Sequence, residues 1–146
     1  MSKKAIGIDI GGTGIKGAVV NLKSGSLIGE RVRYETPAGG KPQDIANVVA
    51  QLVKELPDAK QDMLIGICFP AITRNGVTMS AANVSKEWIG LDADELFTKS
   101  LGRPVHVIND ADAAGVAEIK FGAAKDVQGL VIMTTLGTGI GSALFM

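Results

Sequence analysis

The chain has 146 residues, of which 46% are hydrophobic and only 4% aromatic, so it has room for about one domain with an aliphatic core. Its fifteen basic and fifteen acidic residues cancel, which excludes the strongly basic field typical of nucleic-acid-binding proteins, and we expect no nucleic-acid partner. The single cysteine, Cys68, excludes an internal disulfide and is expected to be a buried, inert thiol. No secretory signal and no membrane-spanning apolar run is visible, so we expect a cytoplasmic protein without a membrane partner.

The first part of the chain predicts three strands followed by a helix. Strand-like runs occupy residues 5–10, 15–22 and 27–36 and are joined by tight turns. The helix is indicated by apolar residues at the spacing of one helical face, and Pro57 ends it. These apolar residues are Ile45, Val48, Val49, Leu52, Val53 and Leu56.

The second part alternates strands and helices. Asp92 and Glu95 form a capping box, which predicts the start of a helix that ends at Gly102. The other expected elements are a buried strand at 63–69, a short strand at 105–108, a helix at 112–121, and two strands at 130–135 and 140–145. A meander of strands followed by this alternation predicts a ribonuclease H-like α/β domain, with a mixed sheet and flanking helices.

Three glycines near the N-terminus, Gly12, Gly14 and Gly17, have the spacing of a dinucleotide-binding turn. That turn requires a following helix, whereas the sequence Ala18-Val19-Val20 is β-prone. The glycines are therefore predicted at the tip of a β-hairpin. A glycine-rich hairpin can direct backbone N–H groups at a phosphate, although a purely structural hairpin is the alternative.

A repeat supports a phosphate-binding role. "GTGIKGAVV" at residues 12–20 is similar to "GTGIGSALF" at residues 137–145, and both are strand, glycine turn and strand. The repeat predicts two related half-folds that face each other across a phosphate or nucleotide. We therefore expect an N-terminal domain at residues 1–122 and the first hairpin of a second, similar domain at residues 123–146.

Four segments in order resemble one family. "DIGGTGIKG", "NDADAAG" and "TTLGTGIGSA" are similar to the phosphate-one, catalytic and phosphate-two segments of the ROK sugar kinases, members of the actin-like ATPase superfamily. "FPAITRNGVTMSAANVSKEWIG" resembles the polyphosphate glucokinases of that family. The resemblance implies transfer of a phosphoryl group from inorganic polyphosphate or ATP to the 6-hydroxyl of glucose.

Asp110 is the expected catalytic residue. Phosphoryl transfer to a hydroxyl needs a carboxylate that orients the hydroxyl and accepts its proton, and Asp110 follows a buried strand, where open α/β sheets bind ligands. The alternative is that Asp110 or Asn109 only caps the following helix. Asp112 is the competing carboxylate and is expected in the first helical turn.

Asn83 and Asn109 are the expected sugar ligands, together with Asp110, because an amide both donates to and accepts from hydroxyl groups. For Asn83 the alternative is an ordinary turn residue. Trp88 could stack on a sugar, but a place in the core is favoured. The lone histidine, His106, is expected to be structural.

The resemblance also implies a set of phosphate ligands. A magnesium ion that bridges phosphate oxygens is expected as cofactor, near Asp9, without a tight protein metal site. The expected phosphate ligands are Asp9, Gly11, Gly12, Thr13 and Lys16 in the first hairpin, and Thr135, Gly137, Thr138 and Gly139 in the second.

Other readings of the resemblance stay open. Another hexose kinase, acting on mannose, fructose or an N-acylhexosamine, a sugar-sensing regulator of the same family, and an actin-like or chaperone-like ATPase are the alternatives. Family members continue beyond the length of this chain with further sugar-binding and adenosine-binding residues. The resemblance implies a homodimer for the longer form, and we expect residues 1–146 alone to be inactive.

Overall fold

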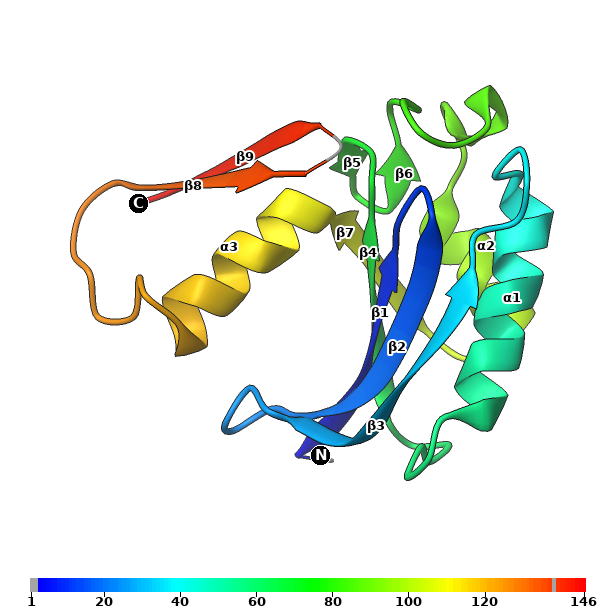
Figure 1. The fold of residues 1–146 in the computed structure, drawn as a ribbon, viewed down its shortest axis with the longest axis horizontal. Coiled ribbons are helices and arrows are strands. Elements are labelled where there is room, and N and C mark those ends of the chain that lie inside the picture. Colours follow the sequence, from blue (N-terminus) through cyan, green and yellow to red (C-terminus); the bar gives the residue numbers. More distant parts are fainter. Residues whose placement is uncertain (1–2, 138) are drawn as a thin grey trace.

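The computed structural model describes residues 3–137 and 139–146, and its centre is a mixed five-stranded sheet (Figure 1). The strands are β1 (Lys4–Ile10), β2 (Gly14–Asn21), β3 (Leu27–Glu35), β4 (Leu64–Phe69) and β7 (Val105–Asn109). Their order is β3-β2-β1-β4-β7. The pairs β3–β2 and β2–β1 are antiparallel, whereas β1–β4 and β4–β7 are parallel. The predicted meander and mixed sheet are confirmed.

Two helices cover one face of this sheet. They are α1 (Pro42–Glu55) and α2 (Ala93–Leu101), which pack beside each other (Figure 1). The apolar face that the sequence predicts for α1 is buried at Ile45, Val49 and Leu52. Leu52 lies over Gly17, where an added Cβ would come within 2.3 Å of the leucine Cδ2, so the third glycine of the first motif serves close packing of β2 on α1.

Trp88 belongs to this core. It is fully buried between Phe69 and Phe97, with ring centroids 4.3 Å and 5.9 Å away, and its indole N–H donates to the carbonyl of Gly40 at 2.8 Å. The core interpretation of Trp88 is therefore confirmed, and stacking on a sugar is excluded.

The predicted capping of α2 is also confirmed. Asp92 is the N-cap, and its side chain accepts a hydrogen bond from the backbone N–H of Glu95 at 2.8 Å. Gly102 ends the helix with a φ of 67°, a left-handed conformation in which glycine is favoured. β7 follows Gly102 closely and pairs with β4 at the edge of the sheet.

The short elements between β4 and α2 are absent from the sequence-based prediction. β5 (Thr73–Arg74) and β6 (Val77–Thr78) form a two-stranded ribbon, and a 3-10 turn, η1, spans Lys86–Trp88. Two-residue strands are too short to show any hydrophobic periodicity, so the sequence pattern predicts only a loop for this segment.

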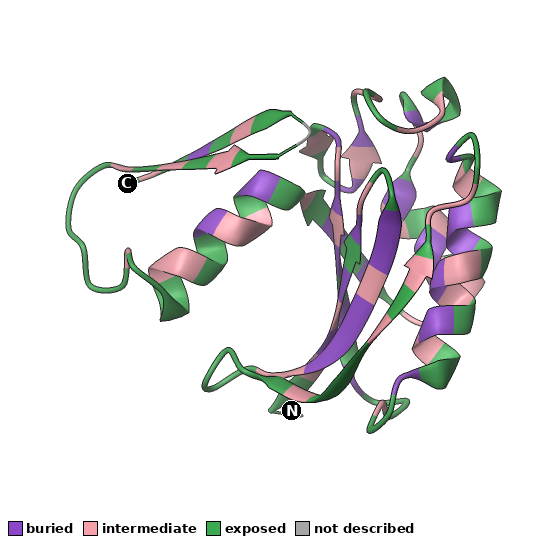
Figure 2. Cartoon of the chain, in the orientation of Figure 1, coloured by how far each residue is buried: buried purple, intermediate pink, exposed green. Residues whose placement is uncertain are grey.

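The other face of the sheet is largely uncovered, and we call it the open face. Leu64 and Ile108 are exposed on it, and Asp9 of β1 lies there directly opposite Lys16 of β2 and Cys68 of β4. Figure 2 shows buried residues (purple) on α1 and on the strands that it covers. Beyond the open face lie α3 (Asp110–Phe121), β8 (Val131–Leu136) and β9 (Ile140–Phe145).

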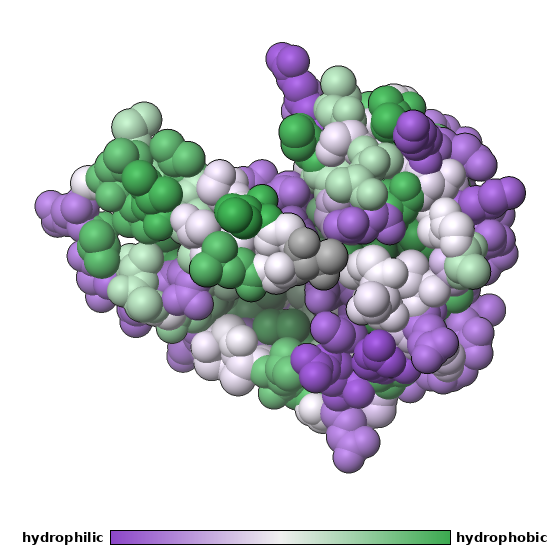
Figure 3. Space-filling view, turned by 45° about the horizontal axis from the view of Figure 1, so that its top comes forward, coloured by the Kyte–Doolittle hydropathy of each residue, from purple (hydrophilic) through white to green (hydrophobic). Residues whose placement is uncertain are grey.

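β8 and β9 form an antiparallel hairpin, here named hairpin 2; β1, β2 and their turn form hairpin 1. Hairpin 2 packs on α3, because Phe145 lies where a Cβ of Gly115 would be and Gly141 lies against Ala111. The opposite face of hairpin 2 exposes Ile132, Leu136, Ile140 and Leu144. Figure 3 shows hydrophobic surface gathered at this end of the molecule. Within the described residues, no helix is long and apolar enough to cross a membrane.

Candidate functional site

The site lies where the parallel strands of the sheet end. β1, β4 and β7 end at Ile10, Phe69 and Asn109, and the segments that follow them come together at one edge of the sheet. Open α/β sheets bind their ligands at the carboxyl ends of the strands. Hairpin 2 reaches the same edge because it packs along α3, which begins there (Figure 1).

A cleft of about 470 Å³ opens between these segments. It brings together Gly11 and Gly12 of hairpin 1, the predicted sugar ligands, and the turn of hairpin 2. Its lining residues are Gly11, Gly12, Pro70, Ala71, Ile72, Ser80, Ala82, Asn83, Asn109, Asp110, Thr135, Leu136, Gly137, Gly139, Ile140 and Gly141. Residues distant in the sequence thus converge on one polar cavity, as expected of a ligand site.

Three predicted phosphate ligands lie outside this cleft. Asp9 and Lys16 line a neighbouring hollow of about 250 Å³ on the open face, with their charged groups 3.8 Å apart. Thr13 is at the exposed tip of hairpin 1. Thr138 lies outside the described residues. The prediction that Asp9, Thr13 and Lys16 contact the same phosphate as the cleft residues therefore stays a prediction.

Asn109 anchors the helix that carries Asp110. Its Oδ1 accepts hydrogen bonds from the backbone N–H groups of Ala111 and Asp112 at 2.9 and 3.1 Å, which makes Asn109 the N-cap of α3. Its Nδ2 donates to the carbonyl of Ala71 at 3.0 Å. The helix begins at Asp110, two residues before the predicted start, because the Asn109 side chain satisfies the first helical N–H groups. With its oxygen occupied, Asn109 can offer a sugar only its remaining N–H.

Asp110 and Asp112, the two candidate catalytic carboxylates, differ in their position relative to the cleft. Asp110 lines the cleft and is exposed, whereas Asp112 is absent from the lining. One oxygen of Asp110 accepts a hydrogen bond from the N–H of Ala111 at 2.8 Å. This bond fixes the carboxylate at the N-terminus of α3, where the helix dipole favours a negative charge.

Asn83 also lines the cleft and lies beside hairpin 1. A Cβ at Gly12 would come within 3.3 Å of the Cβ of Asn83, so the glycine lets the two segments approach closely. Asn83 also lines an adjoining hollow of about 290 Å³ formed with residues 36–40. The carbonyl of Gly40 in that loop accepts hydrogen bonds from Ser85 and Trp88, which hold the loop in place.

The tip of hairpin 1 is held by β3 and by the residue that follows it. The N–H of Gly11 donates to the carbonyl of Gly14 at 2.9 Å, which closes the turn. The hydroxyl of Thr36 donates to the carbonyl of Gly11 at 2.6 Å, and the Nη2 of Arg33 lies 3.5 Å from the carbonyl of Thr13. The sequence analysis missed both anchoring residues, since neither lies within the glycine motif.

Cys68 on β4 lies directly opposite Asp9 on β1. Burial, together with the smaller effect of the negative charges of Asp9 and Asp110, raises the pKa of its thiol from 9.0 to about 11. The thiol is thus neutral and inert, in agreement with the prediction, although the residue is half-buried rather than fully buried.

A dedicated metal cage is absent among residues 3–137 and 139–146, where no group of three or more His, Cys, Asp or Glu side chains has metal-binding geometry. Mg²⁺ is commonly held by one or two carboxylates together with substrate phosphates. The exposed carboxylate of Asp9 fits that limited requirement. His106 lies outside the cleft, with its Nδ1 3.6 Å from Asp94.

The cleft residues that the prediction missed are Pro70, Ala71, Ile72, Ser80, Ala82, Leu136, Ile140 and Gly141. One sequence feature that indicates part of this set is the position of Pro70 directly after a buried strand. The hydroxyl of Ser80 accepts a hydrogen bond from the N–H of Ile72 at 3.0 Å, which closes the loop around the ribbon of β5 and β6.

Comparisons with known proteins agree on one family. The model of the ROK family matches residues 5–146. The polyphosphate glucokinase of Mycobacterium tuberculosis is 43% identical over 143 residues, which cover 97% of this chain and 53% of that protein. The chain spans about half the length of the curated relatives it matches.

Solved structures give the same result. The inorganic polyphosphate/ATP-glucomannokinase from Arthrobacter sp. strain KM is 53% identical and superposes with a TM-score of 0.91, covering 98% of this chain and 58% of that one. A ROK family glucokinase from Streptomyces griseus, solved with glucose and AMPPNP, is 28% identical with a TM-score of 0.78, covering 98% and 44%. The fold is that of the actin-like ATPases, as predicted, and the chain belongs to the ROK family.

Proposed function

We propose that this chain is the N-terminal part of a sugar kinase, which transfers a phosphoryl group from inorganic polyphosphate or ATP to the 6-hydroxyl of glucose. The observation that carries the proposal is the cleft in which Asp110, Asn83 and Asn109 meet the glycine turns of both hairpins. A carboxylate, two amides and two glycine turns are what joint binding of a sugar and a phosphate donor requires. The named relatives support the choice of substrates.

In the proposed reaction, Asp110 is the general base. Its carboxylate accepts the proton of the glucose 6-hydroxyl as that oxygen forms a bond to the terminal phosphorus of the donor. The bond between this phosphorus and the bridging oxygen breaks, and the shortened donor leaves with the electron pair. The hydrogen bond from Ala111 and the cap formed by Asn109 hold the base in position.

The glycine turns are proposed to hold the donor. Backbone N–H groups of hairpin 1 and hairpin 2 donate to phosphate oxygens, and Lys16 adds a positive charge beside them. Asp9 is proposed to hold a magnesium ion against the same phosphates. The ion would neutralise charge on the transferred group.

The domain division is part of the proposal. Residues 1–122 form the first domain, and residues 123–146 are the first hairpin of a second one. We use "full-length form" for a protein that contains residues 1–146 and extends to the length of the relatives. Catalysis, both substrates and a homodimeric state are proposed for that form.

The test is a coupled assay of the full-length form with glucose and each donor, beside Asp110→Asn. Loss of turnover in that variant with retained glucose binding supports the proposal. Mannose is the second acceptor to assay, because the similar Arthrobacter protein is a glucomannokinase. Glucose binding without phosphorylation by either donor would instead indicate a sugar-sensing regulator.

A further inference from the structure

Arg33 on β3 has a position that the proposed function does not use. Its side chain lies on the open face, because Arg33 is directly opposite Lys16, and Lys16 is directly opposite Asp9. These three residues form a row across β1, β2 and β3, at the end of the sheet nearest the tip of hairpin 1. Two of the three are cationic.

The guanidinium group reaches the turn itself. A Cβ at Gly14 would lie 2.9 Å from Nη2 and 3.1 Å from Cζ of Arg33, so the planar group lies against the backbone of Gly14. Nη2 also lies 3.5 Å from the carbonyl of Thr13. The charge of Arg33 is thus located at the edge of the turn that is proposed to hold the donor phosphate.

No carboxylate neutralises this charge in the part of the chain that the structure describes. Lys16 beside it is paired with Asp9, whereas the described residues include no ion pair of Arg33. Arg33 has five N–H donors, of which the Thr13 carbonyl engages one. The remaining donors have the fork geometry that matches phosphate oxygens.

Arg31 continues the cationic row. It is two residues before Arg33 on β3, so it lies on the same face about 6.6 Å along the strand. Arg31 lines the open-face hollow together with Asp9 and Lys16. Lys16, Arg33 and Arg31 therefore form a strip that begins beside the turn of hairpin 1 and extends away from the cleft.

We propose that Arg33 binds the phosphoryl donor: with Lys16 and Arg31, it holds phosphates of an inorganic polyphosphate chain that lie beyond the one being transferred. This inference rests on the proposed function, because it assumes a donor in the glycine turns. A triphosphate has three phosphoryl groups to share among the turns and the strip, whereas a long chain occupies all of them at once. The strip thus favours inorganic polyphosphate over ATP.

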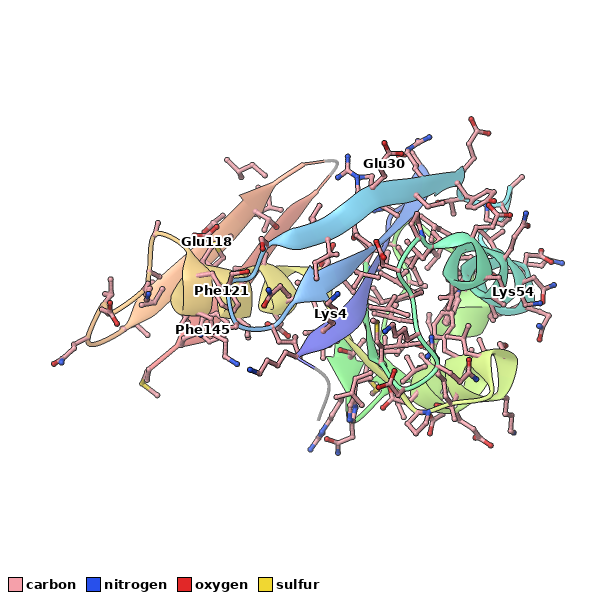
Figure 4. The ribbon with its side chains drawn as sticks, turned by 90° about the horizontal axis from the view of Figure 1, so that it is seen from below. Lys4, Glu30, Lys54, Glu118, Phe121 and Phe145 are labelled. Atoms are coloured by element: carbon pink, nitrogen blue, oxygen red, sulfur yellow. The ribbon has the colours of Figure 1, made fainter. Side chains whose placement is uncertain are left out.

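The experiment compares Arg33→Ala, Arg33→Lys and Lys54→Ala in the full-length form. Lys54 is the control, because it is an exposed cation on α1, the helix that covers the face of the sheet opposite the strip. It also lies at the other end of the molecule from Phe145 of hairpin 2 (Figure 4). KM and kcat are measured for glucose phosphorylation with long-chain polyphosphate and with ATP. Binding of fluorescently labelled polyphosphate is measured separately, without glucose, over a range of salt concentrations.

Arg33→Ala is expected to raise the KM and Kd for polyphosphate about tenfold, since charge-assisted hydrogen bonds to phosphate are lost. The kcat, the KM for glucose and the KM for ATP change much less. The slope of log Kd against log salt concentration falls by the amount expected for the loss of about one phosphate contact. Arg33→Lys restores part of the affinity by its charge alone, and Lys54→Ala behaves as wild type.

Two results would overturn the inference. One is an unchanged affinity and salt slope for polyphosphate in Arg33→Ala. The other is an equal loss with both donors, which would assign Arg33 to supporting the Thr13 backbone. If the proposed function is wrong, the wild-type protein phosphorylates glucose with neither donor. The polyphosphate-binding comparison still decides the role of Arg33 in that case.

Discussion

Asn109 is bonded to Ala71 by a side-chain N–H that donates to the alanine carbonyl at 3.0 Å, and the same side chain caps α3. One carboxamide therefore joins the end of β7, the loop after β4 and the helix that carries the proposed base. This link holds together three of the segments that line the cleft. It also explains why an asparagine, with both a donor and an acceptor, suits this position.

Asn109→Ala is expected to lower the free energy of unfolding by about 1–2 kcal/mol, because the N-cap and the bond to Ala71 are both lost. Urea unfolding followed by circular dichroism measures the change. Asn109→Asp is the matched variant, since it keeps a capping oxygen and loses only the donor to Ala71. Wild-type stability in Asn109→Ala would contradict the anchoring role.

Asp110→Asn in the full-length form is expected to lower kcat by about 10²–10⁴-fold, the usual contribution of a general base, with the Kd for glucose nearly unchanged. Asp112→Asn is the control, because Asp112 does not line the cleft. Turnover and glucose binding are measured on the same preparations. A larger loss in Asp112→Asn than in Asp110→Asn would reverse the assignment.

Lys16→Ala and Thr138→Ala are expected to raise the KM for the phosphoryl donor and to leave the KM for glucose almost unchanged. The reason is that the ammonium group of Lys16 and the hydroxyl group of Thr138 are proposed to bind phosphate rather than sugar. Steady-state kinetics with each substrate varied in turn gives the answer. If only the KM for glucose rises, the hairpins hold the sugar instead of the donor.

Cys68 is expected to react with iodoacetamide about a hundredfold more slowly at pH 8 than an ordinary cysteine, because its pKa is raised from 9.0 to about 11. Removing a nearby negative charge lowers this pKa, so Asp9→Asn and Asp110→Asn speed the reaction. Asp58→Asn, remote from Cys68, leaves it unchanged. Mass spectrometry of timed samples measures the rates.

The same shift has a consequence for stability. In the unfolded chain the thiol ionises near its ordinary pKa of 9.0, whereas in the folded protein it stays neutral until about 11. Because the folded pKa is higher, the unfolded state loses its proton first as the pH rises. The contribution of Cys68 to stability is therefore intact below pH 9 and declines between pH 9 and 11, and Cys68→Ala removes that decline.

Residues 1–146, expressed alone, are expected to self-associate through hairpin 2 and to show no kinase turnover. Ile132 faces Leu144, and Leu136 faces Ile140, on a side of the hairpin that no described residue covers. Sedimentation velocity of the wild type and of the double variant Ile132→Thr, Leu144→Thr tests this, since threonine keeps the β-propensity and removes apolar surface. Identical sedimentation would locate any association elsewhere.

Much of the fold can be predicted because its signals are local. The apolar face of α1 recurs at helical spacing, the capping of α2 is contained in Asp92 and Glu95, and the β-prone residues after Gly17 distinguish a hairpin from a dinucleotide-binding turn. The position of Asp110 at the end of a strand likewise follows from the order of elements. The cleft depends on each of these local features.

The remaining features depend on contacts that the sequence pattern does not contain. The start of α3 is decided by a competition between Asn109 and its acidic neighbours for the same N–H groups. The approach of Arg33 to Gly14 depends on strand register, and a shift between Gly17 and Val19 interrupts that register. No period of two or 3.6 residues reveals either arrangement.

Gly115 and Gly141 let hairpin 2 lie directly on α3, with Phe145 and Ala111 filling the space that side chains would occupy. The second glycine turn and the carboxylate of Asp110 are therefore mounted on one helix, while the first glycine turn is mounted on the sheet. The proposed base and one of the two proposed donor-binding turns therefore belong to a single rigid unit. Any motion of that unit relative to hairpin 1 moves both groups together, so their distance from each other does not change.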